Sequence, residues 1–96
     1  MAKWSMAVDV NGKSVPIGEA TGLVMKEKFE MGALWRGDFR SLLLRLQHEY
    51  PGTTFTEDRH LISSMFYVTT DSLPVVNEIN RMLERNQRIL HESRNH

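Results

Sequence analysis

The 96-residue sequence contains no cysteine, only 3 prolines and no excess of charge of either sign. The lack of cysteine excludes disulfide bonds, thiolate zinc sites and cysteine nucleophiles. No apolar run approaches the length of a membrane span or of the apolar segment of a signal peptide. We therefore expect a cytoplasmic protein that does not contact membranes.

The charge balance bears on the kind of partner. Twelve lysines and arginines face 12 acidic residues, and the balance holds in each third of the chain. Proteins dedicated to nucleic-acid binding usually carry a basic excess, because neutralised phosphates supply much of the affinity. Nucleic acid is therefore a possible but not a favoured partner. A net charge near zero also leaves little repulsion between copies, so we expect self-association.

The length allows one small domain. Folding a chain of this size hides about 65% of the unfolded surface, which supports a core with a small margin of stability. The composition, 41% hydrophobic and 25% charged, is that of a globular protein. We treat residues 1–96 as a single domain with a frayed tail over residues 91–96.

The clearest local pattern is a hairpin near the N-terminus. Apolar and polar residues alternate over residues 4–10, as in a half-buried strand. Asn11-Gly12 then favours a two-residue turn of type I′. In that register Val8 faces Val15. Pro16 lacks an N–H donor, which predicts that the second strand lies at a sheet edge.

Residues 18–34 fit either a strand or a helix. Met25 and Phe29 share the parity of a strand over residues 22–30, whereas the Met, Lys and Glu content favours a helix. Glycines bracket a segment of strand size, so we favour the strand while both alternatives stay open. Residues 31–37 are expected to form a loop.

Two amphipathic helices are predicted further along the chain. The first has Asp38 as its N-cap and ends at Pro51-Gly52. The second begins after Asp71 or Ser72, with Pro74 in its first turn, where the missing N–H costs nothing. The apolar faces, spaced at helical intervals, consist of Phe39, Leu42, Leu43, Leu46 and Tyr50 in the first helix and Val76, Ile79, Met82, Leu83, Ile89 and Leu90 in the second.

Two strands are expected between these helices. Residues 61–70 are rich in β-branched and aromatic side chains, and residues 53–57 can pair with them across a turn at residues 58–60. The predicted fold is an α+β two-layer sandwich, in which two helices cover a mainly antiparallel sheet of about four or five strands. The order is β-β-(β)-α-(β)-β-α, where brackets mark the strands that the pattern leaves open.

No residue pattern points to a complete catalytic site. Phosphate-binding loops and serine nucleophile elbows are absent. His91 and His96 are five residues apart and do not share the helix face that a metal-binding pair needs. An acid–base site around His60, with Asp58 or Glu57, is an alternative, but consecutive turn residues rarely converge on one point. We expect no catalytic residues, no metal and no cofactor, and we favour a protein that is not an enzyme.

Three arginines form the most interesting candidate site. Arg81, Arg85 and Arg88 are spaced to share one face of the second helix. Arginine binds phosphates and carboxylates in bidentate geometry, so this face could bind nucleic acid or a phosphate ligand, with Tyr67 or Phe66 as stacking groups. The same spacing also fits a solvated face whose charge is offset by neighbouring glutamates.

Apolar residues of the last strand indicate an exposed interface. Ile62, Phe66 and Tyr67 place apolar groups on both faces of the sheet, whereas the helices cover one face. Exposed apolar patches commonly mark partner surfaces. The leading hypothesis is therefore a small interaction or regulatory protein that acts by protein–protein contact and forms a homodimer. The arginine face and the His60 site are the alternatives.

Overall fold

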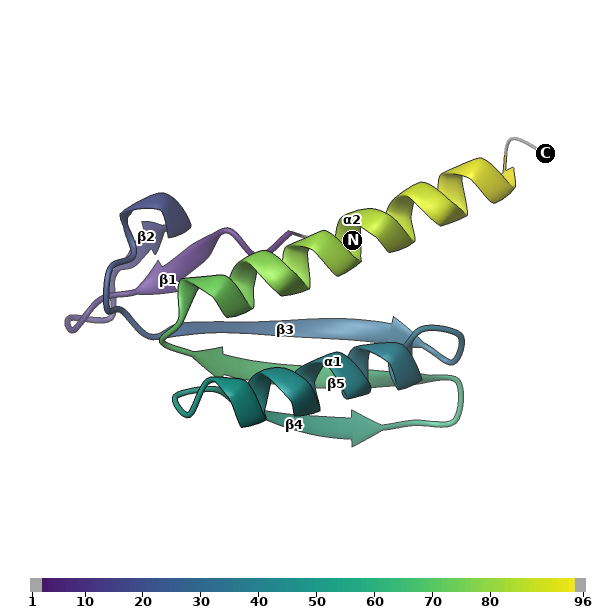
Figure 1. The fold of residues 1–96 in the computed structure, drawn as a ribbon, viewed down its shortest axis with the longest axis horizontal. Helices are drawn as coiled ribbons and strands as arrows, with labels where there is room; N and C mark the ends of the chain where they lie inside the picture. Colours follow the sequence, from purple (N-terminus) through teal and green to yellow (C-terminus); the bar gives the residue numbers. More distant parts are fainter. Residues whose placement is uncertain (1–2, 95–96) are drawn as a thin grey trace.

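The computed structural model describes residues 3–94, and the side chains of residues 3–88. The chain has the order β-β-β-α-β-β-α, which is the α+β fold expected from the sequence (Figure 1). The elements are β1 (Met6–Val8), β2 (Ser14–Pro16), the 3-10 turn η1 (Ile17–Glu19), β3 (Met25–Gly32), α1 (Arg36–Glu49), β4 (Thr54–Arg59), β5 (Ser63–Thr70) and α2 (Leu73–Arg94).

All strand pairs in the described chain are antiparallel. β1 and β2 form one sheet, and a second sheet has the order β3-β5-β4. A bridge joins the two sheets, in which the Val8 N–H donates to the Val24 carbonyl over 2.9 Å. Residues 18–34, which fitted a strand or a helix, thus contain strand β3. The loop expected over residues 31–37 is shorter, because β3 continues to Gly32 and α1 already begins at Arg36.

The register of the first hairpin differs from the predicted one by one residue. Val8 pairs with Ser14, and Ala7 pairs with Val15. A slip of one residue turns every side chain of a strand to the other face. Ala7 is therefore buried, while Met6 is 42% exposed.

The turn of this hairpin explains the slip. The Asp9 carboxylate accepts hydrogen bonds from the N–H groups of Asn11 and Lys13, both at 2.9 Å. The Gly12 N–H donates to the Asp9 carbonyl, and Gly12 has a φ of +81°. This is a type I turn followed by a left-handed glycine, a three-residue connection that the Asp9 side chain stabilises.

Both helices pack on one face of the three-stranded sheet (Figure 1). Along β3, the buried residues alternate with exposed ones, as in a sheet covered on one side. A series of aromatic rings runs through the core from Trp4 through Phe29 and Phe39 to Phe66, with centroids 5.0 to 5.6 Å apart. Phe39 of α1 connects both flanking rings and therefore lies at the centre of the core.

The start of α1 differs from the prediction, because Asp38 is not its N-cap. Trp35 occupies that position and makes no side-chain capping bond. Asp38 lies in the first turn, where a negative charge interacts favourably with the helix dipole. Arg36 reaches the turn between β4 and β5 and donates to the carbonyls of His60 and Ser63 at 2.6 and 3.3 Å.

The course of α2 follows the prediction. It begins at Leu73, with Pro74 in its first turn. The helix is continuous to Arg94, and the fraying expected for residues 91–96 stays a prediction. The expected apolar face is buried at Val76, Ile79, Met82 and Leu83, whereas Ile89 and Leu90 lie outside the described side chains.

A buried asparagine of α2 forms two hydrogen bonds with the backbone of the N-terminal segment. The Trp4 N–H donates to Asn80 Oδ1, and Asn80 Nδ2 donates to the Trp4 carbonyl, both over 2.9 Å. The amide thus keeps both kinds of hydrogen bond in the core, where an unpaired polar group would be costly. This pair fixes the chain that leads into β1 against α2.

A second buried asparagine of α2 lacks such partners. Asn86 is fully buried, and neither polar atom of its side chain has a hydrogen-bond partner in the described structure. Asn86→Leu keeps the number of side-chain heavy atoms and removes this desolvation cost. We expect the variant to raise the free energy of unfolding by about 1–2 kcal/mol. Urea denaturation measures the change, and a lower midpoint would contradict this account of Asn86.

Candidate functional site

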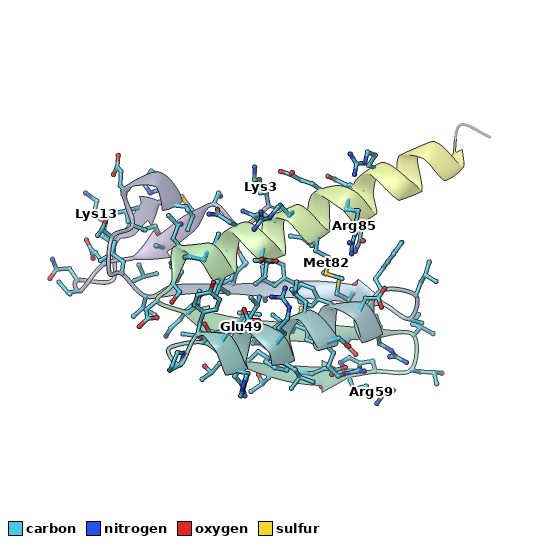
Figure 2. All side chains as sticks on the ribbon, in the orientation of Figure 1. Lys3, Lys13, Glu49, Arg59, Met82 and Arg85 are labelled. Atoms are coloured by element: carbon cyan, nitrogen blue, oxygen red, sulfur yellow. The ribbon has the colours of Figure 1, made fainter. Side chains whose placement is uncertain are left out.

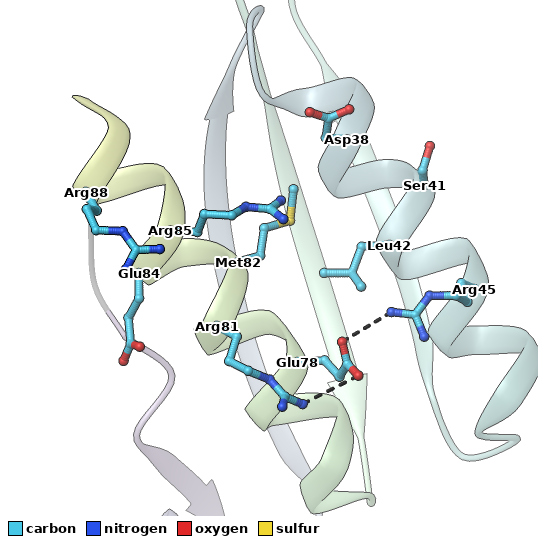
Figure 3. A pocket seen from close by; sticks show the side chains of 10 residues that line it. All are labelled: Asp38, Ser41, Leu42, Arg45, Glu78, Arg81, Met82, Glu84, Arg85 and Arg88. Atoms are coloured by element: carbon cyan, nitrogen blue, oxygen red, sulfur yellow. Dashed lines mark hydrogen bonds and ion pairs between the residues drawn. The ribbon is translucent and has the colours of Figure 1, made fainter. Parts of the chain in front are cut away.

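The structure brings the three arginines of α2 to a groove between the two helices. Arg81, Arg85 and Arg88 line the groove from α2, and Arg45 lines it from α1 (Figure 3). The groove has a volume of about 750 Å³. The spacing along α2 predicted the first three residues. Arg45 was missed, because only the packing of the helices shows which face of α1 turns toward α2.

The floor of the groove is apolar. Leu42 of α1 and Met82 of α2 extend toward one another across it (Figure 3). The remaining lining residues, other than the arginines, are polar or acidic: Asp38, Ser41, Glu78 and Glu84. The groove therefore combines an apolar floor with a charged rim.

Glu78 connects the two helices at one end of the groove. Arg45 Nη2 donates to Glu78 Oε2 at 3.2 Å, and Arg81 Nη2 lies 3.5 Å from Glu78 Oε1. The hydrogen bond to Glu78 raises the pKa of the Arg45 guanidinium. The arginine side chains are 47% and 70% exposed, so these pairs contribute little to stability. Their main effect is to orient the two guanidinium groups.

Arg85 and Arg88 form the positive end of the groove. Both side chains are exposed, and no carboxylate among the described side chains pairs with either of them within 4.0 Å. Glu84, their neighbour on α2, pairs with Lys3 at 3.1 Å. The side chain of Glu92, about one turn beyond Arg88, lies outside the described residues. Arg85 extends toward α1 (Figure 3).

The aromatic residues predicted to stack beside these arginines lie elsewhere. Phe66 is fully buried against Phe39 of α1. Tyr67, the next residue of β5, is 48% exposed on the sheet face opposite the helices. Because neighbouring residues of a strand point to opposite faces, Tyr67 cannot join a site between the helices. The prediction that one of these two aromatic residues stacks beside the arginines is therefore wrong.

The predicted interface needs the same correction. Phe66 belongs to the core and cannot contribute to a surface. Ile62 is 75% exposed in the turn before β5, whereas Tyr67 lies in the middle of that strand. On the open face, Tyr67 is flanked in register by Lys28 and Thr56. Met65, two residues before Tyr67, is half-buried on the same face, and these two are the apolar side chains that β3, β5 and β4 turn to it among polar neighbours. The prediction is thus wrong for Phe66, and for Ile62 and Tyr67 it stays a prediction.

The acidic and basic groups near the end of β4 do not converge. Glu57 accepts hydrogen bonds from Arg40 Nε and Nη2 at 2.6 and 2.7 Å and from the buried Ser64 hydroxyl at 2.6 Å. Asp58 points to the other face and lies 3.2 Å from His60 Nε2, with both side chains more than 60% exposed. β4 extends through residues that were expected in the turn. The exposed pair lacks the water-excluded surroundings that favour acid–base catalysis.

The contacts of Glu57 predict a pH dependence of stability. Hydrogen bonds from Arg40 lower the pKa of Glu57 from 4.5 to about 2. The unfolded chain therefore binds this proton more readily, and the free energy of unfolding falls as the pH decreases from about 4.5 toward 2. Glu57→Gln is expected to remove this part of the pH dependence. The variant should also lower the free energy of unfolding by about 2 kcal/mol near pH 7, because the charged hydrogen bonds of the carboxylate are lost.

Urea denaturation at about pH 7 and pH 3 tests this expectation. The wild type should lose more stability between the two pH values than Glu57→Gln does. Equal losses in both proteins would show that Glu57 is not held ionised by the fold.

The described residues limit other kinds of site. No helix among them is long and apolar enough to cross a bilayer. No group of three His, Asp or Glu side chains in this part of the chain is placed to hold a metal ion. His91 and His96 lie outside the described side chains. Comparison with protein families, with curated proteins and with solved structures gives no match.

Proposed function

We propose that this protein is a small non-enzymatic interaction protein that binds an acidic segment of a partner protein in the groove between α1 and α2. The observation that carries the proposal is the pair of exposed guanidinium groups, Arg85 and Arg88, beside an apolar floor. Arginine pairs with carboxylates through two parallel hydrogen bonds, which gives both affinity and orientation.

The mixed lining of the groove favours a protein segment over nucleic acid. Three carboxylates lie among the four arginines. A continuous phosphate backbone would meet these carboxylates, whereas a peptide can place separate acidic side chains on Arg85 and Arg88. An apolar side chain of the same peptide can contact Leu42 and Met82, as in other groove-bound segments.

Nucleic acid or a phosphate ligand on the same arginines is the second candidate function. The bidentate chemistry of arginine favours it, and steep salt dependence of binding is its expected signature. An enzyme centred on His60 is not favoured, because that side chain is 63% exposed. Self-association, a homodimeric state and a cytoplasmic location stay predictions.

Affinity capture from a lysate of the source organism, with and without nuclease, tests the proposal. The baits are the wild type, the groove variant Arg85→Glu/Arg88→Glu and the control variant Lys13→Glu/Lys28→Glu. We expect the same acidic partner protein with the wild type and the control, in both arms, but not with the groove variant. Material that is lost after nuclease treatment would assign the arginines to nucleic acid instead.

A further inference from the structure

The free edge of β4 (Thr54–Arg59) is a second surface, and it is independent of the groove. Within residues 3–94, β4 pairs only with β5, and Figure 1 shows no element beyond it. The strand has six residues, a continuous register with β5 and no proline. A regular edge of this kind exposes unpaired backbone groups to which another strand can bind.

The edge formed by β2 differs from that of β4. β2 has three residues, and its last residue, Pro16, has no N–H to donate. The 3-10 turn η1 follows directly and leads the chain away. Short strands and prolines are common means of protecting an edge. Of these two edges, β4 is the one open to another strand.

The pairing of β4 with β5 shows which backbone groups face outward. The His60 N–H donates to the Ser63 carbonyl over 2.8 Å, so these two residues form a hydrogen-bonded pair. Such pairs alternate along an antiparallel ladder. The even-numbered residues of β4 therefore bond to β5, and Phe55, Glu57 and Arg59 direct their N–H and C=O groups to the free edge.

Helix α1 carries an exposed leucine on the same side of the molecule. Leu44 is 53% exposed and lies one turn after Arg40, on the same face of α1. Arg40 reaches Glu57 of β4, whereas Arg45 faces the groove toward α2. Leu44 is thus on the flank of α1 that is turned toward β4 and away from α2.

We propose that two copies of this chain pair through β4, antiparallel about a two-fold axis at Thr56, so that their three-stranded sheets become one continuous sheet. An axis perpendicular to the sheet keeps the helices of both copies on one face. It also pairs even-numbered residues with even-numbered ones and odd-numbered residues with odd-numbered ones. Phe55 then faces the partner's Glu57, and both residues have outward backbone groups. Thr54 faces the partner's Asp58, with which its hydroxyl can form a hydrogen bond.

A second copy fits this edge better than an unrelated strand does. A second copy supplies the antiparallel strand. By symmetry it also brings a second α1 to the same face of the joined sheet, so that Leu44 of each copy is turned toward the junction. An axis shifted to Glu57 would place two glutamates directly opposite each other, which destabilises a strand pair. The register centred on Thr56 avoids this repulsion and brings two threonines together, a favourable cross-strand pair.

Sedimentation equilibrium of the full chain tests the proposal. We expect the wild type to have twice the monomer mass of 11.1 kDa. Thr56→Lys places two lysines opposite each other at the axis and should weaken the dimer by roughly tenfold or more. Leu44→Glu, on α1, should weaken it as well.

Thr54→Lys is the matched control, because it adds the same charge to the same exposed face of β4 but opposite the partner's Asp58. This variant should remain dimeric, and circular dichroism shows whether each variant is folded. A wild type that remains at 11.1 kDa at its highest soluble concentration would overturn the proposal. So would folded Thr56→Lys and Leu44→Glu proteins that dimerise as the wild type does. These results do not depend on whether the groove binds an acidic peptide.

Discussion

Replacing Phe39 by alanine is expected to lower the free energy of unfolding by about 4 kcal/mol. Phe39 is fully buried, and its ring lies 5.5 Å from that of Phe29 and 5.0 Å from that of Phe66. The substitution removes both edge-to-face contacts and leaves a cavity between α1 and the sheet. Because domains of this size are stabilised by only about 5–15 kcal/mol, the variant should lose a large share of its stability.

Urea and thermal denaturation followed by circular dichroism measure this loss. The control is Leu61→Ala, since Leu61 is 91% exposed in the turn between β4 and β5. We expect the control to change the free energy of unfolding by less than about 0.5 kcal/mol. Similar losses in the two variants would contradict the position of Phe39 at the centre of the core.

Reversing the charges of Arg85 and Arg88 is expected to weaken binding of an acidic peptide by about 100-fold or more. Hydrogen bonds to charged groups contribute roughly 1.5–3 kcal/mol each, so the loss of two such arginines exceeds two factors of ten. A fluorescent peptide of alternating glutamate and leucine serves as the probe, and fluorescence anisotropy measures its dissociation constant. Both side chains are exposed, so the variant should keep the stability of the wild type.

Lys13→Glu/Lys28→Glu provides the matched control for this experiment. It changes the net charge by the same amount on other surfaces: Lys13 lies on the hairpin at the far end of the molecule from Arg85 (Figure 2), and Lys28 lies on the open face of the sheet. We expect this variant to bind the peptide nearly as well as the wild type. An equal loss in both double variants would show a general effect of net charge and would contradict a site in the groove.

The parts of the site that lie on one element could be predicted from the sequence. The spacing of Arg81, Arg85 and Arg88 is a property of α2 alone, so helical geometry was sufficient to place them together. Arg45 joins them only because α1 packs beside α2, and that packing depends on the whole core. A single helix pattern does not show which exposed flank faces its neighbour.

Competing local interactions explain the differences in the fold. Asn11-Gly12 favours a two-residue turn, but the carboxylate of Asp9 binds the N–H groups of a longer turn and shifts the register by one residue. In β5, Phe66 and Tyr67 are both aromatic, so composition alone did not show which of them is buried. The pairing of β5 with β3 decides this, because Phe66 lies opposite the buried Phe29.

Chemical-shift mapping of the glutamate–leucine peptide on the isotope-labelled full chain tests whether the peptide binds in the groove between α1 and α2. We expect the largest shifts in residues 38–45 of α1 and 78–88 of α2, including the side-chain signals of Arg85 and Arg88. The signals of Tyr67 and Lys28, on the open face of the sheet, should remain unchanged. Largest shifts around Tyr67, with the groove unaffected, would contradict the account and place the binding surface on the sheet.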